Sequence, residues 1–265
     1  MGNADAAAGD ASLLRIETRG TVLTVGLNRP AKRNALNDGI ILALQDCFSA
    51  IPDDVGAVVI HGIGDHFSSG LDLSELTERD ATEGLIHSQM WHRVFDRIQY
   101  CRVPVIAALQ GAVIGGGLEL ACAAHIRVAE PSAYFALPEG QRGIFVGGGG
   151  SVRLPRLIGV PRMADMMLTG RVYSATEGAA YGFSQYLTEA GGALAKALEL
   201  AERVAANAPL TNFAVLQALP LIAEANPQTG LLMESLMATV AQSDKEAKKR
   251  IRAFLDRKTA KVKPT

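Results

Sequence analysis

The feature that most constrains the fold is a change of pattern near Gly147. Before it, short runs rich in β-branched and aliphatic residues alternate with stretches whose apolar residues recur at helical spacing. After it, the pattern is almost wholly helical. Short strands that alternate with helices predict an α/β fold, and the helical end predicts an α appendage to that fold.

The alternating part opens with two β-rich runs on either side of Arg19-Gly20, which predict a hairpin. Further strands are expected at residues 57–60, 105–109, 126–129 and 133–136. Helices are expected at residues 36–51, 83–100, 118–124, 193–206, 210–223, 229–241 and 245–258. The chain is thus expected to consist of a disordered tail (1–11), an α/β core (12–205) and a C-terminal helical region (206–265).

Size and charge narrow the possible partners. With 265 residues and a formal net charge of −1, the chain can hold one sizeable domain and has no global field to attract nucleic acid or anionic membranes. Its start lacks the features of a signal peptide, and no apolar run approaches the roughly 20 residues of a membrane span. Its 3 cysteines are expected to be buried and reduced. We therefore expect a cytoplasmic protein without a nucleic-acid or membrane partner.

Familiar nucleotide, hydrolase and zinc motifs are absent from the sequence. There is no strand-linked GxGxxG, no P-loop, no GxSxG and no HExxH. The 5 histidines show no convincing ligand spacing, so no metal site is expected.

A triple glycine, residues 115–117, separates an expected strand from an expected short helix. Glycine lets a ligand approach the backbone closely, and the start of a helix presents free N–H groups with a partial positive charge. Such a place can hold a developing oxyanion. Glu119 would lie in the first turn of this helix, beside the anion site.

Several segments resemble the enoyl-CoA hydratase/isomerase (crotonase) superfamily, in the family's order and over nearly the whole chain. They are Leu27–Leu36, His66–Leu73, Gly111–Ala121 and 143–154. The resemblance implies a crotonase-like spiral of ββα units with a C-terminal helical trimerisation region. It also implies an acyl-CoA thioester substrate and a homo-oligomer, either a trimer or a dimer of trimers.

The same resemblance implies roles for particular residues. Glu119 and Glu139 would be the catalytic carboxyl groups. The backbone amides of Leu71 and Gly116 would form the oxyanion hole, and Gly147 would help to position the catalytic water. The implied CoA-binding residues are Arg33, Ala35, Leu36, Ser69, Asp72, Leu73, and, from the C-terminal helix of a neighbouring subunit, Phe254 and Arg257.

The implied reaction is hydration of a trans-2-enoyl-CoA to a 3-hydroxyacyl-CoA. CoA is then part of the substrate, and no separate cofactor is expected. Other crotonase reactions remain open: enoyl-CoA isomerisation, hydratase-lyase chemistry or thioester hydrolysis. Isomerases of the family often keep only the carboxylate at position 139, so Glu119 favours hydration. Leu137 and Val146 differ from residues frequent in hydratases, and this leaves the acyl group open.

The sequence argues against two non-catalytic alternatives and leaves the roles of Arg142 and Trp91 open. A non-catalytic RNA-binding relative would need lysines on the helix at 38–51, which has no Lys or Arg. A CoA-binding protein without activity would not need both glutamates. Arg142 could pair with Glu139, with an acidic acyl group or with a surface carboxylate, and Trp91 could line the acyl pocket or pack in a helical core.

Overall fold

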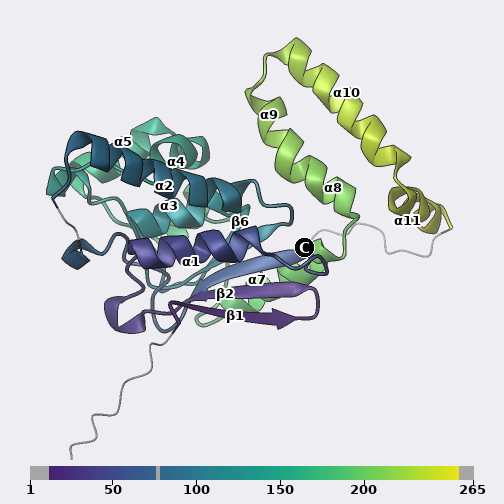
Figure 1. Ribbon diagram of the computed structural model, residues 1–265. Helices are drawn as coiled ribbons and strands as arrows, with labels where there is room; N and C mark the ends of the chain where they lie inside the picture. The colour runs from purple at the N-terminus through teal and green to yellow at the C-terminus, as the bar shows by residue number, and fades with distance from the viewer. Residues whose placement is uncertain (1–11, 76–77, 257–265) are drawn as a thin grey trace, which may run out of the picture.

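The computed structural model describes residues 12–75 and 78–256, and its central element is a six-stranded sheet (Figure 1). Strands β1 and β2 form the expected hairpin and pair antiparallel, whereas the remaining strands pair in parallel. The order across the sheet is β1 (Leu14–Arg19), β2 (Val22–Leu27), β3 (Ala57–Gly62), β4 (Val105–Leu109), β6 (Ile126–Ala129) and β9 (Tyr186–Leu187).

A second sheet of three strands was not expected from the sequence. Its order is β5 (Ala112–Ile114), β7 (Tyr134–Ala136) and β8 (Tyr173–Ser174). The chain adds one strand to each sheet and then a helix: β4, β5 and α3 (Gly116–Ala123), followed by β6, β7 and, after a one-turn 3-10 helix at Gly140–Arg142, α4 (Gly150–Ile158). This is the spiral of ββα units that the resemblance implied.

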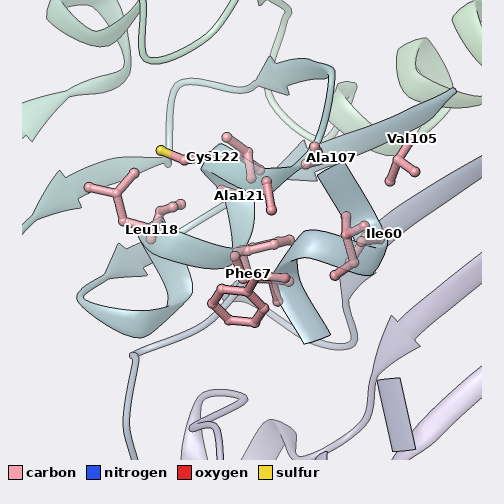
Figure 2. Packing of buried hydrophobic residues seen from close by; sticks show 14 of the residues in the cluster. Ile60, Phe67, Val105, Ala107, Leu118, Ala121 and Cys122 are labelled. Atoms are coloured by element: carbon pink, nitrogen blue, oxygen red, sulfur yellow. The ribbon is translucent and has the colours of Figure 1, made fainter. Parts of the chain in front are cut away.

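The two faces of the larger sheet bury separate apolar clusters, because successive strand residues point to opposite sides. Val58 and Ile60 of β3 belong to the cluster that contains residues of α1 (Asp38–Ser49), α2 (Ala81–Gln99) and α3. Ala57 and Val59 face α7 (Ala193–Ala205) on the other side. Figure 2 shows Ile60, Phe67 and Leu118 within the first cluster, which thereby holds α3 in place beneath the site.

Helix α2 begins two residues before the expected start, because a capping box fixes its N-terminus. The Asp80 carboxylate accepts the N–H groups of Thr82 and Glu83, both at 2.8 Å, and Glu83 reaches back to the Asp80 N–H. The cap sets the register of the helix and therefore decides which of its residues face α3 and the site.

The chain beyond Gly147 is mainly helical, as expected, but it also supplies β8 and β9, two-residue strands at the sheet edges that were not predicted. Helices α5 (Val160–Thr169) and α6 (Ala175–Tyr181) follow α4. One-turn 3-10 helices also occur at Pro30–Lys32 and Leu73–Glu75.

The last helices project away from both sheets (Figure 1). Large apolar side chains on α10, such as Leu231, Leu232 and Leu236, are more than half exposed. No helix in the described part of the chain is long and apolar enough to cross a membrane. The projecting elements are α8 (Pro209–Phe213), a π-helical segment (Ala214–Ala218), α9 (Leu219–Glu224), α10 (Pro227–Ser243) and α11 (Lys245–Leu255).

Candidate active site

Two backbone segments that are distant in sequence approach each other closely at Leu71 and Gly116. A Cβ at Gly116 would lie 3.6 Å from the Leu71 nitrogen. Gly70 has a φ of +88°, and a Cβ there would lie 2.6 Å from the Ile114 carbonyl oxygen and 3.2 Å from the Gly116 nitrogen. Only glycine allows this contact. The two residues predicted to supply amides for an oxyanion are therefore neighbours.

Helix α3 starts at this contact. Its N-cap, Gly115, has a φ of +52°, and the Glu119 N–H donates to the Gly115 carbonyl oxygen at 2.9 Å. The Gly116 N–H is thus in the first turn, where a helix provides no acceptor of its own. This amide can serve a ligand, and the helix adds a partial positive charge.

Glu119 is buried, with 4% of the residue exposed. Its carboxyl group is hydrogen-bonded to the N-terminus of a second helix, α4. Its Oε1 accepts the N–H groups of Gly148 at 2.9 Å and Gly150 at 2.7 Å, where α4 begins. Burial raises the pKa of Glu119, while the amides of Gly150, Gly148 and Gly147 act in the opposite direction. The side chain therefore has a fixed position and a perturbed protonation.

Glu139 follows β7 and is also buried, with 7% exposed. Its Oε2 has no hydrogen-bond partner among the described residues. Burial raises the pKa of Glu139, and the nearby Glu119 carboxylate adds to that rise. Two carboxyl groups that repel each other in a dry site tend to share one negative charge, so one can act as an acid while the other acts as a base.

Both glutamates line one cavity of about 360 Å³, together with the predicted residues Leu71, Gly116 and Gly147. The structure thus brings together all five residues predicted for the reacting centre. The rest of the lining comes from α2 and the loop before α4: Gly84, His87, Ser88, Trp91, Ile144, Phe145, Val146 and Gly148.

Of the α2 residues that line the cavity, only Trp91 was a candidate from the sequence; Gly84, His87 and Ser88 were not predicted. His87 Nε2 is 2.7 Å from Asp38 Oδ1, and the Ser88 hydroxyl donates to the Gly147 carbonyl oxygen at 2.6 Å. The spacing of residues 84, 87, 88 and 91 indicates that they share one face of a helix, but spacing alone does not say whether that face lines a cavity.

A second cleft of about 420 Å³ adjoins the cavity at Leu71 and is the candidate site for CoA. Five of the predicted CoA residues line it: Arg33, Ala35, Ser69, Asp72 and Leu73. Arg142 lines this cleft and not the cavity, so it is not placed to meet an acyl group.

Asp72 organises the cationic edge of this cleft. Its Oδ2 is 2.9 Å from both Arg29 Nη2 and Lys32 Nζ, and its Oδ1 accepts the Ser74 hydroxyl. The Ser74 hydroxyl, then Lys32 and Arg29, hold the pKa of Asp72 below its ordinary value. Asp72 therefore positions two cations beside the cleft.

Two predicted CoA residues, Leu36 and Phe254, lie outside this cleft, and a third cannot be placed because it is not among the described residues. Leu36 is fully buried, and its N–H and carbonyl bond to Gly70 and Asp72, so it supports the cleft from beneath. Phe254 is exposed on α11, in the projecting region away from the core (Figure 1). Arg257 lies outside the described residues, as does the tail expected at residues 1–11.

The sequence matches the family described as enoyl-CoA hydratase/isomerase over residues 17–264. The chain therefore belongs to the enoyl-CoA hydratase/isomerase (crotonase) family.

Relatives and solved structures agree with this assignment. The chain is 34% identical to the 2,3-dehydroadipyl-CoA hydratase of Escherichia coli (strain K12), over 95% of this chain and 99% of the relative. It is 32% identical to the short-chain-enoyl-CoA hydratase of Clostridium acetobutylicum, over 92% and 94%. Its fold is similar to the crystal structure of a proposed enoyl-CoA hydratase from Rhodopseudomonas palustris, with 82% identity, a TM-score of 0.92 and coverage of 95% and 97%.

Proposed function

We propose that this protein hydrates a trans-2-enoyl-CoA to a 3-hydroxyacyl-CoA. The observation that carries the proposal is the pair of buried carboxyl groups, Glu119 and Glu139, in one cavity beside two close backbone amides. Hydration needs a base for the attacking water and an acid for the carbon that receives a proton. An isomerase moves a single proton and does not require the second carboxyl group.

In the proposed reaction, the thioester oxygen lies against the Leu71 and Gly116 amides. Water, held by Glu119, Glu139 and the Gly147 amide, attacks Cβ while Glu119 accepts its proton. Negative charge passes to the thioester oxygen, and the amides stabilise it. Glu139 then gives its proton to Cα, so the elements of water are added and the two carboxyl groups have exchanged protonation states. Before the next turnover Glu119 gives up the proton that it accepted and Glu139 regains one, by exchange with solvent, so both carboxyl groups return to their starting states.

The fixed position of Glu119 supports its assignment as the base, since the amides of Gly148 and Gly150 favour its ionised form. The unpartnered Oε2 of Glu139 supports its assignment as the acid, since a protonated carboxyl group in a dry site avoids the cost of an isolated buried charge. CoA enters as part of the substrate, and the proposed steps use no other cofactor or metal.

We propose that the chain assembles as a homotrimer or a dimer of trimers. The projecting helices α8–α11 and the exposed leucines of α10 support subunit contacts there, since large exposed apolar surfaces usually mark an interface. In such an assembly α11 of one subunit would bring Phe254 to the CoA cleft of another. Light scattering should give three or six times the mass of one chain, and a monomeric mass would contradict the proposal.

The reaction is tested by the loss of conjugated thioester absorbance when the protein is added to trans-2-enoyl-CoAs. Glu119→Gln and Glu139→Gln should each lower kcat by about 10²- to 10⁴-fold, because each removes one proton transfer. Both variants should fold, since glutamine keeps the shape and the acceptor oxygen of glutamate. Near-normal turnover in both variants would contradict the assigned roles. Turnover of 3-enoyl-CoA alone would indicate isomerisation instead.

A further inference from the structure

The acyl end of the cavity contains space that hydration itself does not explain. Resting on the proposed function, we propose that this end binds an uncharged, medium-length acyl chain and that Gly84 sets how long the chain can be. Gly84 is then a specificity-determining residue at a site distant from the reacting atoms.

Gly84 lies within α2, and its backbone gives no reason for a glycine. Its N–H donates to the Asp80 carbonyl oxygen at 2.9 Å, as in an ordinary helix, and it is not among the glycines with positive φ. Glycine inside a helix is less favourable than alanine. A Cβ at Gly84 would meet no heavy atom within 4 Å, and the residue lines the cavity. The missing side chain therefore leaves free volume in the cavity itself.

The position of Gly84 along α2 indicates a chain length. Gly84, His87, Ser88 and Trp91 share one helix face because of their spacing. Trp91 marks the reacting end, since a Cβ at Gly116 would lie 2.9 Å from Trp91 Cζ3. Trp91 is seven positions after Gly84 in the helix, which corresponds to about 10 Å along the helix axis. A crotonyl group, with one methyl group beyond Cβ, ends well short of Gly84, whereas a medium-length chain reaches it.

The lining of this path favours a hydrocarbon. Ile144, Phe145 and Val146 also line the cavity, and the two glutamates of the reacting centre are the only Asp, Glu, Lys or Arg residues among the described residues of the lining. Two polar side chains of α2 in this lining have protein partners: His87 Nε2 meets Asp38, and the Ser88 hydroxyl donates to the Gly147 carbonyl oxygen. The Trp91 indole N–H, at the reacting end, is a donor without a partner among the described residues and offers no positive charge to a carboxylate. A carboxylate at the end of the acyl group would lose its water without gaining a cation.

Binding of saturated acyl-CoAs tests this inference without turnover, so its failure is distinct from a failure of hydration. Calorimetry with the full-length protein should show tighter binding of octanoyl-CoA than of butyryl-CoA or the acidic adipyl-CoA. Gly84→Leu should reduce the octanoyl-to-butyryl preference by roughly 10-fold or more, because it fills the end of the path that only the longer acyl chain reaches. Gln89→Leu, which adds a leucine to the exposed face of the same helix, is the matched control.

Two results would overturn the inference: an unchanged octanoyl-to-butyryl preference in the Gly84 variants, or adipyl-CoA binding as tight as that of octanoyl-CoA. Circular dichroism confirms that each variant is folded. If Gly84→Leu does not fold, Gly84→Ala decides, because alanine suits a helix and still reduces the free volume; its effect on the preference should be smaller but in the same direction.

Discussion

The two ends of the cavity use glycine for opposite reasons. At the reacting end, a Cβ at Gly115 would lie 2.7 Å from Glu139 Oε1, and one at Gly150 would lie 2.8 Å from Glu119 Cγ. At the acyl end, a Cβ at Gly84 would have no heavy atom within 4 Å. At Gly115 and Gly150 the reacting end thus leaves no room for a methyl group. The acyl end is defined by volume, so an added group there should matter only for substrates that reach it.

The largest expected effect is at the reacting end. Gly115→Ala forces alanine into a φ of +52° and places its methyl group against the Glu139 carboxyl group. We expect kcat for a short 2-enoyl-CoA to fall by about 10²-fold, because even a displacement of about 1 Å of a catalytic group can cost that much. Steady-state kinetics on the folded variant would check this. Unchanged kcat would show that the crowding at Gly115 does not fix Glu139.

A smaller effect concerns the cost of burying Glu139. Burial raises its pKa above the ordinary value of 4.5, so the folded protein retains a proton that the unfolded chain releases. The stabilising contribution of this protonated carboxyl group is present below pH 4.5 and is lost as the pH rises through the folded pKa. Glu139→Gln avoids this loss. Its free energy of unfolding should therefore increase, relative to the wild-type protein, from pH 4.5 towards neutrality.

Denaturant unfolding at several pH values would measure this difference. Glu189→Gln, at an exposed loop position, removes the same group without removing a buried charge and serves as the control. If the free energy of unfolding of Glu139→Gln changes with pH in the same way as that of the wild-type protein, burial does not perturb this carboxyl group.

The smallest effect is expected at the acyl end. Gly84→Ala should raise the free energy of unfolding by up to about 1 kcal/mol, because alanine favours the helix and its methyl group meets no atom within 4 Å. Turnover of crotonyl-CoA should stay unchanged. Denaturant unfolding and kinetics with that substrate would check both points, and a loss of crotonyl-CoA turnover would show that the two ends are not independent.

The reacting centre could be predicted because its residues lie in local patterns. Glu119 follows a triple glycine, and the strand-glycine-helix order places it at a helix start whatever the rest of the chain does. The resemblance supplied Glu139, Leu71 and Gly147, and the structure brings them together. Their chemical roles remain proposals.

Features that depend on tertiary packing could not be predicted. The strand β5 has only three residues between two glycines, and the two-residue β8 and β9 exist only because a sheet edge is available to pair with. The role of Gly84 could not be read from the sequence either, since a glycine in a helical pattern shows no sign of the empty space beside it. Leu36 illustrates the reverse case: its segment matches a CoA motif, but the residue itself is buried.

The hydrogen bonds from the start of α4 to Glu119 have an evolutionary consequence. In the proposed reaction Glu119 is the base, and its carboxyl group also accepts the amides at the start of α4, so selection for catalysis and selection for folding would act on the same residue. A descendant that abandoned this chemistry would still need an acceptor for the Gly148 and Gly150 amides. Glutamine could replace Glu119 in a single step, whereas alanine would require the residues around 148–150 to change with it. Substitutions at position 119 and at positions 148–150 should therefore be correlated, even in lineages that have lost catalysis.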